Sequence, residues 1–229
     1  MKKVNKKLNI FGYALVIVLV FLCGINVSYA YFTARATVQG SLDFYDLNIQ
    51  FAYTNVDDGM LNPISTGETE YEIIPNSAGI FRGVEFGFKT SSNQGIQTIG
   101  LMSMDNSCNW YARVKIKAVK TLASGSTYVE DSTDTTDYGE FIILNTAINT
   151  DVKFNSADNY YYFMSEVNAE EQGGFSYQPL ATAAKISTSA PPDITNGYLK
   201  ISLLFEAVQA DKQAVISTFG NAAATFMGL

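Results

Sequence analysis

The sequence predicts an all-β protein: an antiparallel β-sandwich of jelly-roll type with a few short helices in its loops, preceded by an apolar signal helix. Three observations support this class. Several segments alternate apolar and polar residues with period two, which is typical of strands with one face on a core. Turn-forming pairs separate these segments, and long stretches with the period of a helix are scarce.

The N-terminus has the order of a secretory signal peptide. Four lysines precede an almost wholly apolar run over residues 10–27, and the small residues Ser28 and Ala30 then occupy positions −3 and −1 before Tyr31. We therefore predict cleavage after Ala30, which separates a signal peptide, residues 1–30, from a single domain, residues 31–229. The alternative is an uncleaved membrane anchor, because about 18 apolar residues approach the length that spans a bilayer.

Five segments carry the alternating pattern of half-buried strands. They are residues 42–44, 47–53, 84–88, 111–118 and 199–205. In each of them the apolar side chains predict a core face and the residues between them predict a solvent face. Residues 54–64 and 129–138 are predicted loops, while residues 181–184 and 207–224 are predicted to hold short helical turns.

Charge and composition exclude several classes of function. Removing the four lysines of residues 1–30 from the fifteen basic residues leaves 11, against 22 acidic residues, so the net charge is −11. So acidic a surface repels nucleic acid, and we expect no nucleic-acid partner. The sequence has no histidine, which excludes serine triads of the usual type and zinc sites built on histidine. We assign no catalytic residue, metal site or cofactor, and we predict that the protein is not an enzyme.

Cys108 is the only cysteine after residue 30, so the mature chain cannot form an internal disulfide. One interpretation is a small buried side chain beside Trp110, and the other is a bridge between subunits. Trp110, the only tryptophan, is predicted to lie in the core.

Two acidic segments have alternative interpretations. Asp131, Asp134 and Asp137 lie in a predicted loop and suggest calcium, but their spacing of three differs from the spacing of two in an EF-hand loop. A solvated polar loop is the preferred interpretation. The glutamates that alternate through residues 68–72 predict the exposed face of an edge strand.

The densest aromatic run is Tyr-Tyr-Tyr-Phe over residues 160–163. Successive side chains of a strand point to opposite faces, so we predict that two of these four rings stay outside the core. Tyr160, Tyr161 and Tyr162 are therefore candidates for surface binding. They provide an alternative function for the chain, a monomeric cell-surface binding module that recognises glycan or another surface.

Residues 29–33, Tyr-Ala-Tyr-Phe-Thr, and residues 40–44, Gly-Ser-Leu-Asp-Phe, resemble the start of the TasA/camelysin family. These are secreted proteins of Gram-positive bacteria whose leaders are removed by a SipW-type signal peptidase. Residues 109–116 and 199–210 are similar to a central and a terminal strand of the same family. Camelysin relatives have been described as metalloproteases, but this chain lacks His-Glu-x-x-His, so that activity is not transferred to it.

The resemblance implies a secreted jelly-roll subunit that assembles into extracellular fibres of a biofilm matrix. In such fibres the N-terminal segment of one subunit completes the sheet of its neighbour. The implied partners are further copies of the chain, the signal peptidase during export and an accessory matrix protein.

The segment exposed by cleavage, residues 31–41, has the pattern that such a donor strand needs. Its apolar side chains alternate with tyrosine, threonine, arginine and glutamine, so that one face can enter a groove while the other stays in water. The alternative is that residues 31–41 form the first strand of their own domain. The residues of the predicted apolar face are Phe32, Ala34, Ala36 and Val38.

Overall fold

The computed structural model describes residues 47–64, 69–76, 80–103, 107–124, 127–168, 174–192, 194 and 198–229. Within these ranges the chain consists mainly of strands, with two short α-helices and short 3₁₀ segments. In chain order the elements are β1 (Ile49–Asn55), β2 (Leu61–Pro63), β3 (Glu70–Pro75), β4 (Glu85–Phe86), β5 (Phe88–Lys89), β6 (Gly95–Ser103), β7 (Trp110–Ser124), β8 (Thr127–Glu130), η2 (Gly139–Phe141), β9 (Ile142–Asn145), β10 (Val152–Asn155), β11 (Tyr160–Phe163), β12 (Ser176–Ala181), β13 (Ala183–Ile186), β14 (Tyr198–Gln209), α2 (Lys212–Phe219) and α3 (Asn221–Met227).

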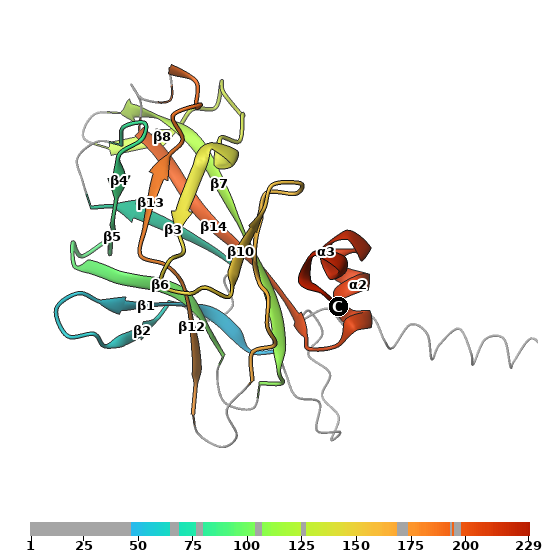
Figure 1. Cartoon of the computed structure of the whole chain (residues 1–229). Helices are drawn as coiled ribbons and strands as arrows, with labels where there is room; N and C mark the ends of the chain where they lie inside the picture. Colours follow the sequence, from blue (N-terminus) through green and yellow to red (C-terminus); the bar gives the residue numbers. More distant parts are fainter. Residues whose placement is uncertain are drawn as a thin grey trace, which may run out of the picture. The chain divides into compact units, whose positions relative to one another are not determined.

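The described strands form one large and one small antiparallel sheet. The large sheet has the order β10-β11-β7-β14-β3-β5-β6-β1-β2, with β12 beside β6 and β8 beside β7. The small sheet has the order β4-β13-β9. Figure 1 shows the long strands β7 and β14 side by side, with α2 and α3 (red) next to the end of β14. The prediction of an all-β, antiparallel protein is therefore confirmed.

The two longest strands, β7 and β14, pair along most of their length, from Trp110 opposite Gln209 to Thr121 opposite Tyr198. They are the segments with the most regular alternation in the sequence, which places their apolar side chains on one face of the sheet. The predicted core face of each strand is confirmed, because every one of these side chains is at most 8 % exposed: Ala112, Val114, Ile116 and Ala118 in β7, and Leu199, Ile201, Leu203 and Phe205 in β14.

The large sheet curls so that distant strands face each other across one core. Three strands lie between β1 and β14 in the sheet order, yet the ring centroids of Phe51 in β1 and Phe205 in β14 are 5.1 Å apart and meet edge to face. The small sheet packs against the same core, because the backbone N–H of Leu144 in β9 donates to the hydroxyl of Tyr161 in β11 at 3.0 Å. Both sheets thus contribute side chains to one apolar cluster.

The two helices cover the outer face of the large sheet, opposite the core. The carboxylate of Asp211 caps α2 by accepting hydrogen bonds from the N–H groups of Gln213 and Ala214 at 2.8 and 3.0 Å. Residues 207–224 were predicted to hold helical turns, which is right for α2 and most of α3, whereas residues 207–209 continue β14. The helices and sheet share a second apolar cluster, formed by Tyr111, Tyr162, Val208, Val215, Phe219, Ala223, Ala224 and Met227.

Two predicted loop or helix segments are strands in the structure. Residues 54–64 contain β2, which pairs with β1 through a tight turn that ends at Met60. The alanines of residues 181–184 belong to β12 and β13, where Ala183 and Ala184 are buried in the small sheet. Isolated alanines are compatible with either structure, so strand pairing overrides their helical preference here.

Two predictions about strand exposure are also corrected. Residues 84–88 do not form one strand, because the chain leaves the small sheet at Gly87 and enters the large sheet at Phe88; Val84, predicted inside, is 55 % exposed. Glu70 and Glu72 are exposed as predicted, but β3 lies between β14 and β5 and is not an edge strand.

The predicted signal peptide, the cleavage residues and the donor segment 31–41 lie outside the described residues, as does the predicted strand at residues 42–44. Among the helices that the structure describes, none combines the length and the apolar character needed to cross a bilayer.

Candidate functional site

The aromatic run of β11 lies between two apolar layers. Tyr161 and Phe163 join the main core and are 4 % and 1 % exposed, while Tyr162 joins the cluster under the helices and is fully buried. The prediction that two of the four rings stay at the surface is therefore wrong, and only Tyr160 is partly exposed. Tyr161 is buried in the main core and Tyr162 beneath α2 and α3, so neither side chain is accessible for surface binding.

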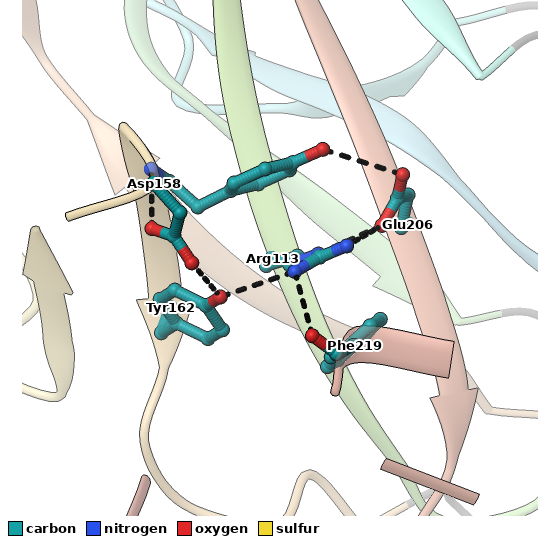
Figure 2. Close-up of polar contacts among 6 residues, drawn as sticks. Arg113, Asp158, Tyr162, Glu206 and Phe219 are labelled. Carbon is teal, nitrogen blue, oxygen red and sulfur yellow. Dashed lines mark hydrogen bonds and ion pairs between the residues drawn. The ribbon is translucent and has the colours of Figure 1, made fainter. Parts of the chain in front are cut away.

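Arg113 is a buried side chain on the outer face of β7 and the centre of a polar cluster that connects β11, β14 and α2 (Figure 2). Its Nε and Nη2 atoms lie 2.7 and 2.6 Å from Oε2 of Glu206 in β14. Its Nη1 donates to the hydroxyl of Tyr162 at 3.1 Å and to the backbone carbonyl of Phe219, the last residue of α2, at 3.4 Å. The hydroxyl of Tyr162 in turn donates to Asp158 at 2.5 Å.

Two aromatic rings enclose the guanidinium group of Arg113. Its Cζ atom lies 4.0 Å from the ring centroid of Tyr160 and 4.5 Å from that of Phe219. Both distances are within the range of cation–π contacts, which strengthen as water is excluded. The hydroxyl of Tyr160 also donates to Oε1 of Glu206 at 3.4 Å. A single side chain therefore holds the end of α2 against three strands.

The electrostatics of this cluster favour a fixed charge state. Burial lowers the pKa of Arg113, but the hydrogen bonds that it donates to Tyr162 and Glu206 oppose this and leave the pKa raised. Burial, together with the hydrogen bond to Asp158, raises the pKa of Tyr162 to about 12, although Arg113 acts in the opposite direction. Neither group exchanges protons near neutral pH, so the cluster is suited to holding the helices in place and not to acid–base chemistry.

Reasoning from the sequence missed the role of Arg113. The residue alternates with core alanines and valines and is therefore predicted to face solvent, beside Lys115 and Lys117. The signal that could have predicted its burial is the apolar content of the C-terminal segment. A segment of this kind packs against a sheet face and buries the side chains on that face.

The acidic loop after β8 completes the pairing of β7. Asp137 Oδ1 accepts hydrogen bonds from the backbone N–H groups of Ala118 and Gly139, both at 2.9 Å, and the N–H of Tyr138 donates to the carbonyl of Ala118 at 2.7 Å. The loop thus satisfies backbone groups of β7 between the parts paired with β8 and β11. A Cβ atom on Gly139 would lie 2.1 Å from the carbonyl oxygen of Ile116, so only glycine fits there.

The three aspartates of this loop have separate partners. Asp131 accepts hydrogen bonds from Thr133, and Asp134 pairs with Lys120 Nζ at 2.9 Å and accepts from the hydroxyl of Tyr138 at 2.8 Å. The bonds from Lys120, from Thr136 and from Tyr138 lower the pKa of Asp134 far below its usual value. In the described parts of the chain, no three acidic or cysteine side chains lie close enough to hold a metal ion.

We expect Asp137→Ala to lower the free energy of unfolding by about 1–2 kcal/mol, because two backbone N–H groups lose their acceptor. Asp137→Asn keeps an oxygen acceptor at this position, so it should retain most of the stability. Urea-induced unfolding measures both variants, with Glu140→Ala as an exposed acidic control in the same segment. Equal losses for the alanine and asparagine variants would contradict this role for Asp137.

The edges of the large sheet differ in how well they are protected against further pairing. Pro63 interrupts the N–H pattern of β2, and Pro179 does the same in β12, where its carbonyl also accepts a hydrogen bond from Nδ2 of Asn149 at 2.9 Å. At the opposite end of the sheet, β10 has no proline and carries Phe154, which is 46 % exposed. Strand β8 also lacks proline, but β10 places its exposed ring against Tyr161 of the main core, so among the described edges a strand added at β10 would extend that core.

Cys108 is partly exposed and is not part of a disulfide, and burial raises the pKa of its thiol. Trp110 is fully buried, so the prediction that it lies in the core is confirmed.

The described residues define an antiparallel all-β protein with a helix-covered sheet face and an edge strand, β10, that lacks proline and lies beside the main core. No family model, curated protein or solved structure matches the chain. Its function is therefore inferred from its own residues and geometry.

Proposed function

We propose that this chain is a secreted structural subunit of an extracellular fibre or biofilm matrix of a Gram-positive-type bacterium. Its domain is a sandwich of jelly-roll type, and an apolar signal helix precedes it until cleavage after Ala30. Subunits assemble head to tail by β-strand complementation through residues 31–41. The partners are further copies of the chain, with the signal peptidase acting during export and an accessory matrix protein as an additional partner.

The observation that carries the proposal is an unprotected sheet edge in an all-β domain. An edge strand presents unpaired N–H and C=O groups, and an extended segment from another molecule satisfies them. The segment after Ala30 supplies the required alternation, with Phe32 and Val38 on its apolar face and polar side chains on the other. The leader and the resemblance to the TasA/camelysin family favour export and assembly outside the cell.

The energetics of one such contact are moderate. Burial of Phe32 and Val38 contributes about 1.5–3 kcal/mol each, and each backbone hydrogen bond adds about 1 kcal/mol. Ordering the free segment costs about 1–2 kcal/mol for each residue and offsets much of this gain. The contact joins two different surfaces, so it propagates into a filament instead of closing into a dimer. Fibre stability then arises from repetition along the filament.

Deletion of residues 31–38 from the chain that begins at Tyr31 should leave a folded monomer that does not polymerise. Electron microscopy and sedimentation measure assembly, and circular dichroism checks the fold. A pair of variants separates the two faces of the segment: Ala36→Lys should abolish fibres, whereas Gln39→Lys, on the polar face, should permit them. An unfolded deletion product or unchanged fibres would contradict strand complementation.

The alternative function, a monomeric binding module that recognises glycan or another surface, loses its main candidate residues. Tyr161 and Tyr162 are buried, and Tyr160 stacks on Arg113. No other observation in the described residues favours it over assembly.

A further inference from the structure

Strand β10 ends the large sheet beside the main core. It pairs with β11 from Val152 opposite Phe163 to Asn155 opposite Tyr160, and the described residues include no second partner strand for it. Val152 and Phe154 occupy the core side of β10, where Val152 is buried but Phe154 is 46 % exposed. The core is therefore incompletely covered at this edge.

The ring that Phe154 contacts also belongs to the opposite layer of the core. The ring centroids of Phe154 and Tyr161 are 4.9 Å apart, and the hydroxyl of Tyr161 accepts the backbone N–H of Leu144 in β9. Strand β9 pairs with β13 on one side only among the described strands. An edge of the small sheet and an edge of the large sheet thus flank the same tyrosine, and Phe154 lies half exposed beside it.

The two faces of β10 differ in polarity. Lys153 and Asn155 alternate with the apolar pair and lie on the outer face, where Lys153 is exposed. A strand that joins this edge needs apolar residues toward Phe154 and polar residues beside Lys153. Residues 31–39 have this alternation over more than twice the length of β10.

We propose that β10 is the acceptor edge for residues 31–41 of a second copy of this chain. This inference rests on the proposed function and adds the place where the donor segment binds. The side chains of Phe32, Ala34, Ala36 and Val38 lie on the side of Phe154 and extend the core past the present edge of the sheet. Arg35 of the donor segment is on the same outer face as Lys153. Because like charges directly opposite each other are unfavourable, a threonine of the donor segment lies opposite Lys153 instead.

Cross-linking between two populations of the chain tests this contact directly. All chains begin at Tyr31 and carry Cys108→Ser; one population has a cysteine in place of Phe32, Ala34, Ala36 or Val38, and the other has Phe154→Cys. Directly opposed side chains in neighbouring strands have Cβ atoms about 4.5–5.5 Å apart, close to the separation that a disulfide tolerates. Oxidation of the mixed fibres should give a disulfide-linked dimer with at least one donor position, and only when both populations are present.

Phe175→Cys is the matched control, because Phe175 is a 55 % exposed phenylalanine beside the protected strand β12. It should give no dimer with any donor position. In a second assay Phe154→Asp should lower the fraction of protein in sedimenting fibres about tenfold or more, because the donor strand would bury an unpaired carboxylate, while Phe175→Asp should leave it unchanged.

The outcomes distinguish the two proposals. If the parent chain forms fibres but cross-links appear only with Phe175→Cys, or with neither Phe154→Cys nor Phe175→Cys, then β10 is not the acceptor. That outcome would leave the proposal of strand complementation intact. Absence of fibres from the parent chain would overturn both. Fibres that persist in the Phe154→Asp variant would also overturn the assignment to β10.

Discussion

Arg113→Ala lowers the free energy of unfolding by about 3 kcal/mol, the largest effect we expect from a single substitution outside the main core. Arg113 is 9 % exposed, and its replacement removes the ion pair with Glu206, the hydrogen bond that Arg113 donates to Tyr162 and the stacking on two rings. Removal of one member of a buried pair costs about 3–5 kcal/mol in general. Glu206 is half exposed and can regain water, which keeps the expected loss at the lower end.

The loss should appear first in the helices. Amide hydrogen exchange in α2 and α3 should accelerate in Arg113→Ala before exchange in β7 and β14 does, because Arg113 connects the end of α2 to the sheet. Arg82→Ala is the matched control: Arg82 is exposed and donates to the carbonyl of Ala190, so its loss should stay below about 1 kcal/mol. Equal losses for the two variants, measured by urea-induced unfolding, would contradict a special role for Arg113.

Stability falls steeply above pH 10 and is nearly constant between about pH 6 and pH 8. Burial is the main reason that the pKa values of Tyr71, Tyr162 and Tyr177 are each raised to about 12, against about 10 in an unfolded chain. Below pH 10 these phenols are protonated in both the folded and the unfolded state, so their contribution to the free energy of unfolding is fully present. Between pH 10 and pH 12 only the unfolded state loses the protons, and the free energy of unfolding falls by at most about 1.4 kcal/mol per pH unit for each tyrosine.

Urea midpoints at pH 7, 9, 10 and 11 measure this loss. Because the sequence has no histidine, no side chain with an ordinary pKa titrates in the neutral range. Tyr71→Phe removes one of the three ionisable phenols and should make the alkaline decline shallower. An equal midpoint at pH 9 and pH 11, or a decline that begins below pH 8, would contradict the account.

The elements that the sequence predicted best are strands in which the alternation of apolar and polar residues is enough to identify the buried face. The core faces of β7 and β14 were predicted correctly because alternate side chains of a strand point to the same face, and the alanine, valine, isoleucine and leucine residues alternate in this way. The hairpin of β1 and β2 was missed, because a strand of three residues that ends in Pro63 carries almost no periodicity.

The candidate site was harder to predict, since it depends on which elements meet. Tyr162 and Arg113 are on the side of the sheet opposite the core, and alternation alone assigns that side to water. They are buried because the C-terminal helices return to this face, a tertiary contact that no local pattern contains. The three aspartates of the loop after β8 similarly resemble a cation site in the sequence, whereas Asp134 and Asp137 have partners on β7 and Asp131 has its partner within the loop.

The most direct test of the central claim is electron microscopy of two chains after concentration in physiological salt. One chain begins at Tyr31, and the other retains residues 1–30. The account predicts regular fibres from the Tyr31 chain alone, because cleavage frees the donor segment. A monodisperse monomer from the Tyr31 chain under all conditions, or equal fibres from both chains, would contradict it.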